Sequence, residues 1–509
     1  MLTISSPLPR GVRRALQVIH ANVGQRQNVS QLAAVAGVSA RTLQRQFMDF
    51  LGKSPHAIGQ DIGLEQARHE LLQGAPGDRI ADVALRCGFA HFGRFAREYR
   101  RRYGETPSCT LKRQARFVAE FPSRLTVLAP SRDQPTMVLV PLETEAEDGA
   151  VTKALARNLA DDLATALTRA GIAVTYEARF ARYRMQGAIR GSDAHKRVVL
   201  QLVDQEGGRQ LWAHSNEGVL IGGSKSHELL ATRIVAALQP NLRWAEIERA
   251  RLTPDSARGP HDLALLAMPG VLSLDAEGNA RALDLLERAL DQDPDFPLAV
   301  ALAAWAYGQR TVYHLSSDPA REKARGLELV RKAQSLSGDA TMLAVLGNAL
   351  TLLDDLGSAA RVIGKALAID GGCVWAWSRS GWLEVYRGEA ESAIERFKIA
   401  LDLAPQDKLA FNSMVGIGCA HFKAGNYAEA VRWQERALIE HPSSVWMHRT
   451  LSPAYLLTGA RPEAKRSLEA LRSRHPELTV SEVRRGMPPL PENYRNLVLD
   501  ALSDVGLPG

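Results

Sequence analysis

Two short stretches near the start of the chain carry arginine and glutamine side chains at helical spacing. Arg41, Gln44 and Arg45 lie in ARTLQRQF, and on a helix these three positions share one face. Guanidinium and amide groups form bidentate hydrogen bonds with the edges of bases, and guanidinium groups also pair with phosphates. A second stretch, FGRFAREYRRRY, contains five arginines. These residue types indicate binding to a polyanion.

Each of these stretches is the second member of a pair of short predicted helices. The first pair has Ser30 as its expected N-cap, a turn at Gly37 and Ser39 as the cap of its second helix. The second pair turns at Gly88. Two short helices across a glycine-containing turn predict a helix-turn-helix. The apolar positions are Leu32, Val35, Ala36, Leu43, Phe47 and Leu51 in the first pair, and Ile80, Val83, Ala84, Phe92, Phe95, Tyr99 and Tyr103 in the second.

Residues 10–110 resemble the DNA-binding region of the AraC/XylS family. The resemblance is carried by VSQLAAVAGVSARTLQRQF, by IADVALRCGFAHFGRFAREYRRRYGETP, and by the spacing of Gly88, Phe89, Phe95, Tyr99, Gly104 and Pro107. It implies two recognition helices that enter successive major grooves. The implied base-reading positions are Arg41, Gln44, Arg45, Phe92, Gly93 and Arg97, and the outer arginines expected to contact phosphates are Arg94, Arg100, Arg101 and Arg102.

Three glycines depart from the family pattern. Gly93 has no side chain where many members have a polar reader, which predicts weaker reading by the second half. Gly59 and Gly63 lie in the helix that joins the two halves, and each is expected to cost about 1 kcal/mol of helix stability relative to alanine. The sequence therefore predicts a less rigid spacing between the halves.

The positive charge of the chain is concentrated at its start. Residues 1–115 contain 17 lysines and arginines against 8 aspartates and glutamates, a net charge of +9, whereas all 509 residues have a net charge of +7. The remaining residues therefore sum to −2. A basic head on a nearly neutral body is typical of a polyanion-binding domain, although basic faces also occur on ordinary solvated surfaces.

Residues 135–250 show a mixed pattern. MVLVPL predicts a buried strand, residues 151–170 an amphipathic helix, residues 183–190 and 196–215 strands with a turn at Gly207 and Gly208, and residues 227–242 a closing helix. The order β-α-β-β-β-α predicts a small α+β domain. VLVP, MQGAIR, LVDQEGGRQLWA and IVAALQPNL resemble the TolB-N-like regulatory domain that precedes helical repeats in some adenylate cyclases and winged-helix regulators, which implies no catalytic residue.

Residues 260–480 are self-similar. ALDQDP, ALAIDG, ALDLAP and ALIEHP place an alanine before a proline or glycine, and the copies follow one another at 44, 33, 34, 37 and 34 residues. A period near 34 resembles the tetratricopeptide repeat, which implies an α-solenoid with a groove for a peptide or helix. The expected helix-contact residues are Ala282, Ala289, Gly326, Ala333, Ala359, Ala366, Ala393, Ala400, Ala430, Ala437 and Ala464. Trp375, Trp377, Trp382 and Trp446 are candidates for the groove, although packing between repeats is the commoner role.

The expected architecture is a mostly α multidomain chain. Its expected parts are an AraC-type double helix-turn-helix domain at 1–115, a small α+β regulatory domain at 135–250, a tetratricopeptide-repeat solenoid at 260–480, and a tail or capping segment at 481–509. The leading hypothesis is a sequence-specific DNA-binding transcription regulator. Its expected partners are double-stranded promoter DNA, RNA polymerase, and a protein, peptide or other effector in the repeats.

Two other hypotheses remain open. One is a scaffold or adaptor whose head no longer reads DNA, and the other is an enzyme hidden in the middle block. The sequence has no nucleophile-base-acid pattern, no cofactor loop and no Cys/His cluster of metal-ligand spacing, so we expect no catalytic residue, cofactor or metal. The start has no apolar stretch after its charges, and no run of 18 apolar residues occurs, which predicts a cytoplasmic protein without a membrane partner.

Overall fold

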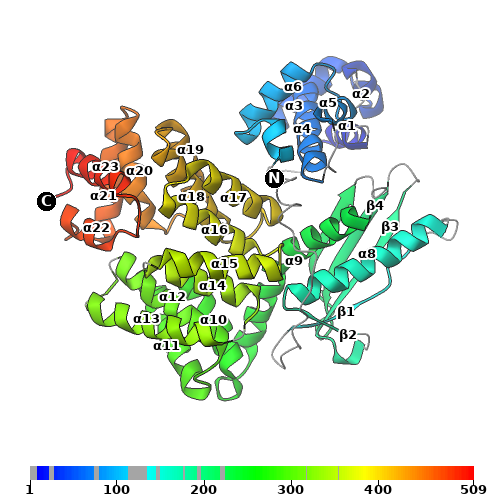
Figure 1. Ribbon diagram of the computed structural model, residues 1–509. Helices are drawn as coiled ribbons and strands as arrows, with labels where there is room; N and C mark the ends of the chain where they lie inside the picture. Colours follow the sequence, from blue (N-terminus) through cyan, green and yellow to red (C-terminus); the bar gives the residue numbers. More distant parts are fainter. Residues whose placement is uncertain are drawn as a thin grey trace. The chain divides into compact units, whose positions relative to one another are not determined.

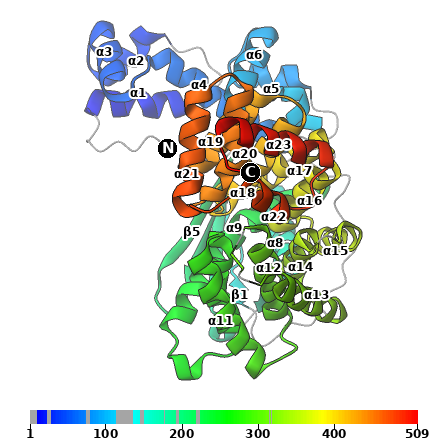
Figure 2. The same cartoon turned by 90° about the vertical axis from the view of Figure 1, so that its left-hand side faces the viewer.

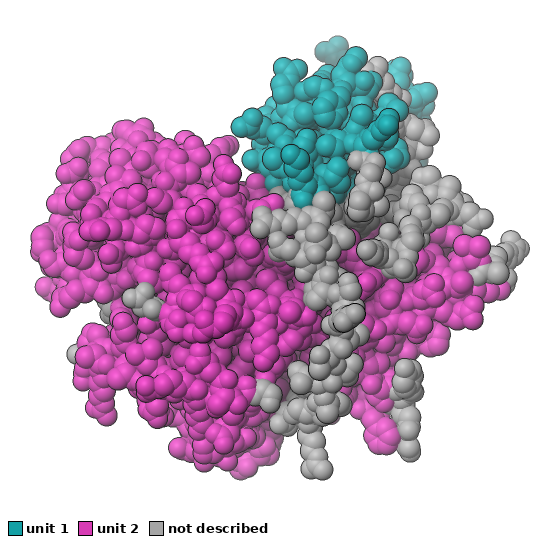
Figure 3. Space-filling view, viewed as in Figure 1, with its two compact units in different colours: residues 1–120 teal, residues 121–509 magenta. Residues whose placement is uncertain are grey.

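A computed structural model describes residues 9–21, 28–73, 79–112, 135–144, 150–175, 178–191, 196–217, 224–313, 315–316, 318–336, 338–353 and 355–509. The chain forms two compact units, residues 1–120 and residues 121–509, which Figure 3 shows in different colours. Among the residues with described positions, no helix is long and apolar enough to cross a membrane. The described residues are mostly helical, as the sequence predicts, and they contain one five-stranded sheet, which has one strand more than expected.

Unit 1 contains two small apolar cores that share one long helix. The first core gathers Val12, Leu43 and Phe47 among its buried residues, and the second gathers Phe95 and Tyr99. Helix α4 contributes to both cores, and Figure 2 shows it running between the two halves. The helices are α1 (Arg10–Ala21), α2 (Val29–Ala36), α3 (Ala40–Leu51), α4 (Pro55–Gln73), α5 (Ile80–Arg86) and α6 (Phe92–Tyr103).

Two details of the first helix pair differ from the sequence prediction. The cap of α2 is Asn28 and not Ser30: the Asn28 side chain accepts a hydrogen bond from the Ser30 amide, and Gln31 completes a capping box. Helix α2 therefore begins at Val29, two residues earlier than a cap at Ser30 implies. Val35 is 48% exposed, so the inward face of α2 consists of Leu32 and its helical neighbours Ala33 and Ala36.

Unit 2 begins with a mixed sheet in the order β2-β1-β3-β4-β5. Strand β1 pairs in parallel with β2 and with β3, whereas β3, β4 and β5 are antiparallel neighbours. The short strand β2 was not predicted, because its three residues carry too little alternation to be recognised. The strands are β1 (Thr136–Leu139), β2 (Ala173–Thr175), β3 (Tyr183–Arg190), β4 (Arg197–Asp204) and β5 (Gln210–Glu217), with a 3-10 turn η1 at Ala178–Phe180.

Two helices bury the apolar residues of this sheet. Helix α8 (Ala150–Arg169) packs against α9 (Ser224–Leu252), and both share a core with the strands (Figure 1). Helix α9 is longer than the predicted closing helix and continues through Pro240, so that Ile247 and Ala250 belong to the core of the repeats. The sheet and the repeats therefore lie in one compact unit, and their division into separate domains at 135–250 and 260–480 stays a prediction.

Six helix pairs follow among the described residues. In each pair the two helices pack against one another, as a repeat of this period requires. The pairs are α10 (Pro260–Ser273) with α11 (Ala276–Gln292), α12 (Pro297–Val312) with α13 (Pro319–Ser335), α14 (Ala340–Leu352) with α15 (Leu356–Ile369), α16 (Val374–Arg387) with α17 (Ala390–Leu403), α18 (Ala410–Lys423) with α19 (Tyr427–Glu440), and α20 (His448–Leu457) with α21 (Arg461–Arg474). Two 3-10 turns accompany them, η2 (Asp255–Ala257) and η3 (Val445–Met447).

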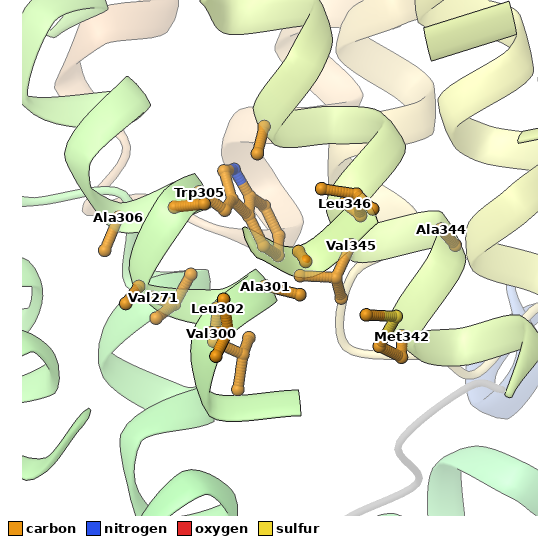
Figure 4. Packing of buried hydrophobic residues seen from close by; sticks show 14 of the residues in the cluster. Val271, Val300, Ala301, Leu302, Trp305, Ala306, Met342, Ala344, Val345 and Leu346 are labelled. Atoms are coloured by element: carbon orange, nitrogen blue, oxygen red, sulfur yellow. The ribbon is translucent and has the colours of Figure 1, made fainter. Parts of the chain in front are cut away.

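The small residues predicted at helix contacts are all buried. Residues with larger side chains at these positions would hold the paired helices apart. Around them, side chains of α12 and α14 interdigitate beside the Trp305 ring, as Figure 4 shows. After the last pair, α22 (Val480–Gly486) and α23 (Glu492–Val505) contribute Val483, Val498 and Leu502 to the core that covers α20 and α21.

Candidate nucleic-acid interface

Helix α3 presents three of the predicted base-reading residues on one exposed face. Ser39 caps the helix, because its Oγ accepts a hydrogen bond from the Thr42 amide at 3.1 Å. Leu43 and Phe47 lie fully buried on the inner side of the helix. The outer side carries Arg41, Gln44 and Arg45, all of which are exposed and form no side-chain hydrogen bond or ion pair with another described residue.

Helix α6 is held by a ladder of aromatic rings. The Phe95 ring lies 5.0 Å from Phe89 and 5.5 Å from Tyr99, and Tyr99 lies 4.7 Å from Tyr103, all between ring centroids. These contacts fix the rotation of α6 about its axis. Phe92, at the first turn, is 47% exposed, which is unusual for a large apolar side chain and leaves its ring available to a partner.

The other predicted readers of α6 lie at its surface. Arg97 is exposed and has no partner among the described residues. Gly93 is exposed too, and a Cβ atom built there would have no other group within 4 Å. The space at Gly93 is therefore open, and the backbone of this turn is accessible where a side chain would otherwise stand.

The four arginines predicted to contact phosphates have different surroundings. Arg100 and Arg101 are exposed and unpaired among the described residues. Arg94 forms an ion pair with Glu98 along its own helix at 2.9 Å, a pair of exposed partners that opens at little cost. Arg102 instead binds two carboxylates of α4, Asp61 at 2.6 Å and Glu65. The Arg102 guanidinium is therefore an internal link between α6 and α4.

Helix α4 is linked to the second half of unit 1 by further contacts. Arg68 pairs with the buried Glu105 at 3.3 Å and lies over the Tyr103 ring at 4.6 Å from its centroid. At Gly63, an added Cβ would lie 2.7 Å from the Cys87 carbonyl oxygen and 3.2 Å from the Phe89 ring. Gly63 thus permits a close approach of α4 to the turn after α5, which the sequence prediction of a loosely spaced joining helix did not foresee.

Comparison with known proteins agrees with this geometry. Residues 32–113 match the family model described as a helix-turn-helix domain. The chain is 39% identical over 106 residues to the probable thc operon regulatory protein of Rhodococcus erythropolis, an alignment that covers 21% of this chain and 32% of the relative. The N-terminal unit is an AraC-type DNA-binding domain. Because the alignment spans about a third of that relative, the similarity concerns the head alone.

Two of the similar solved structures align with different shares of the chain. A probable AraC family transcriptional regulator from Rhodopseudomonas palustris is 36% identical, with a TM-score of 0.20, over 20% of this chain and 96% of that one. A tetratricopeptide repeat protein from Parabacteroides merdae covers 48% of this chain and 93% of its own, with 16% identity and a TM-score of 0.28. The six successive helix pairs between residues 260 and 474 themselves form the tetratricopeptide-like solenoid, whereas the TolB-N-like resemblance of residues 135–250 stays a prediction.

Proposed function

We propose that this protein is a sequence-specific transcription regulator whose AraC-type head binds promoter DNA and whose second unit receives the regulatory signal. The observation that carries the proposal is the set of exposed, unpaired guanidinium groups on α3 and α6, the second helices of the two helix-turn-helix motifs. Unpaired guanidinium groups bind phosphates and guanine without first breaking an internal ion pair. A head that no longer read DNA would have little reason to retain them.

The proposed readers follow from side-chain chemistry. Arg41, Arg45 and Arg97 are suited to guanine O6 and N7, and Gln44 to adenine N6 and N7. The exposed Phe92 ring is suited to the methyl group of thymine. The proposed phosphate contacts are Arg100 and Arg101, with Arg94 after release from Glu98, while Arg102 serves mainly to hold α6 against α4.

The remaining partners belong to the same proposal. We propose that the protein contacts RNA polymerase while bound at the promoter, and that the repeats bind a protein or another effector that sets the response. This assignment places the protein in the cytoplasm. The head folds around its own two cores, which supports a division of labour between DNA binding and signal reception.

The test uses the isolated head, residues 1–120, and its promoter fragment in a competition shift assay against unrelated DNA. Affinity should fall steeply with salt, with a log-log slope of about −0.9 for each phosphate neutralised. Arg45→Ala or Gln44→Ala should lose preference at particular base pairs, at about 1 to 3 kcal/mol per bidentate contact, whereas Arg101→Ala should weaken all sequences alike. Equal affinity for unrelated DNA would contradict the proposal and favour the scaffold hypothesis.

A truncation tests where the signal enters. Ile247 and Ala250 of α9 are buried in the core of the repeats. Removal of residues 260–509 would therefore expose these two apolar side chains. The cut therefore belongs after residue 120, between the compact units. The head alone should occupy the operator while transcription no longer follows the signal. A signal response that survived this cut would place the sensor in the head.

A further inference from the structure

The repeats of unit 2 close upon themselves around a small cavity. Tyr313 at the end of α12 lies 5.2 Å from the Trp446 ring in η3, between ring centroids, and Arg449 of α20 donates a hydrogen bond to the Val312 carbonyl at 3.2 Å. The second and the sixth helix pairs are thus in contact across the inner side of the solenoid. The first helices of the intervening pairs, α14, α16 and α18, also contribute residues to the lining of this cavity.

Two guanidinium groups line the cavity without a carboxylate partner. Arg379 of α16 donates to the Asn348 Oδ1 at 2.8 Å and to the Asn412 Oδ1, and Arg449 donates to a backbone carbonyl. No aspartate or glutamate of the described residues lies within 4.0 Å of either group. This arrangement contrasts with Arg243 in the same unit, which lies 3.9 Å from Asp407.

Both guanidinium groups remain charged despite their surroundings. Burial lowers the pKa of Arg379 to about 10, so the group is still protonated at neutral pH. Burial also lowers the pKa of Arg449. Two half-buried cations with neutral acceptors only are an unfavourable arrangement, which an anion placed between them relieves.

The walls of the cavity are aromatic. Trp382 stacks with Tyr386 at 5.9 Å between centroids, and the Arg379 guanidinium lies 5.9 Å from the centroid of the Trp305 ring. The Trp446 Nε1 is buried and has no hydrogen-bond partner, so it is a further donor for a ligand. The free space is about 40 Å³, which admits a small group and excludes a drug-sized molecule.

We infer that this cavity binds a small organic acid, whose carboxylate lies between Arg379 and Arg449 and whose apolar part lies against the aromatic walls. A planar carboxylate matches the fork of hydrogen-bond donors that each guanidinium offers. The ligand bridges repeats that are far apart in the sequence, so it stabilises the closed form of the solenoid. That this acid is the regulatory signal rests on the proposed function, whereas the binding site itself does not.

The test titrates the full-length protein with acetate and propionate, with acetamide and propionamide as neutral isosteres, and with inorganic phosphate. Thermal unfolding and tryptophan fluorescence report binding, since Trp382 and Trp446 line the cavity. The acids should bind saturably and raise the melting temperature, and the amides should not. Amides that bind as well as the acids, phosphate binding alone, or no saturable binding of either acid would overturn the inference.

Variants locate the site. Arg449→Met should fold, because it removes a half-buried charge that has no carboxylate partner. It should weaken the binding of acetate and propionate at least tenfold. Trp446→Phe keeps an aromatic ring, smaller than the indole, and removes the free N–H. We expect it to weaken binding of the acids a few-fold, and it keeps the site testable if Arg449→Met does not fold. The matched control is Arg472→Met on the exposed side of α21, which should change nothing. Unchanged affinity for the acids in both cavity variants would overturn the assignment of the binding site to this cavity.

Transcription from the promoter, and promoter binding by the isolated head, are measured separately from binding of the acids. An acid that binds the full chain and alters transcription from the promoter supports both the site and its regulatory role. An acid that binds without altering transcription confirms the site and refutes the role. Loss of promoter binding by the isolated head would contradict the proposed function and leave the cavity unaffected.

Discussion

Gly63 in helix α4 offers the sharpest test of how the two halves of the head are held. An alanine there gains about 1 kcal/mol of helix propensity. Its Cβ, however, would lie 2.7 Å from the Cys87 carbonyl oxygen and 3.2 Å from a ring carbon of Phe89. Because the nearest atom belongs to the backbone, the turn after α5 must move, and overpacking of this kind costs about 1 to 3 kcal/mol. We expect Gly63→Ala to destabilise the head by about 1 to 2 kcal/mol.

Gly59 in the same helix is the matched control. An alanine Cβ at this position would lie 3.7 Å from Ile19 Cγ2, which is an ordinary van der Waals contact. Gly59→Ala should therefore stabilise the head by up to about 1 kcal/mol. Urea unfolding of residues 1–120, followed by circular dichroism, measures both changes against the parent. A Gly63→Ala head as stable as the Gly59→Ala head would refute the reasoning, because helix propensity alone would then explain the data.

Three further outcomes are expected. Arg101→Ala should reduce the log-log salt slope of DNA binding by about 0.9 and leave the stability of the head unchanged. Arg102→Ala should instead lower the unfolding midpoint of the head, because it breaks the ion pair with Asp61. Equal effects of the two variants in both assays would contradict the distinction between a phosphate contact and an internal link. Burial raises the pKa of Asp370 from 3.8 to about 6, so this group favours the folded state fully below pH 3.8 and loses that contribution as the pH rises through 6. Asp370→Asn should therefore remove this dependence in a pH series of melting temperatures. Iodoacetamide should label the exposed Cys109 of the native protein, as mass spectrometry would show, and labelling of the buried Cys87 at the same rate would count against its packing.

Local sequence signals located most of the elements of the head. The spacing of Leu43 and Phe47 predicted the inner face of α3, and the exposed position of Arg41 and Arg45 followed from the same helical period. The repeat period likewise predicted which small residues of the solenoid are buried. Asn28 and Ser30 stood close together as possible caps, and the signal that separates them was overlooked: Gln31 stands three residues after Asn28, as a capping box requires, whereas Ala33 stands three residues after Ser30.

The candidate site was less accessible to sequence reasoning. Arg102 and its two neighbours look alike along α6, and only the fold brings Asp61 and Glu65 of α4 to the Arg102 guanidinium. Two acidic residues four positions apart in the joining helix were a signal that an arginine partner was possible, without indicating which one. Similarly, four tryptophans were candidates for the groove, and the structure places Trp382 and Trp446 at the cavity while Trp375 and Trp377 are buried in packing.

The sequence by itself determined the apolar face of the head helices and the position of most turns, because these depend on residues within a few positions of one another. It also determined the charge of the head and the repeat length, which are a sum and a spacing along the chain and require no tertiary contact. Tertiary structure decided which charges remain free and which are neutralised. Arg102 is paired across 41 residues with Asp61, whereas the described hydrogen-bond partners of Arg379 on α14 and α18 are neutral asparagine side chains. Whether an ionic group finds a partner depends on which helices pack together, and helical periodicity carries no information about that choice.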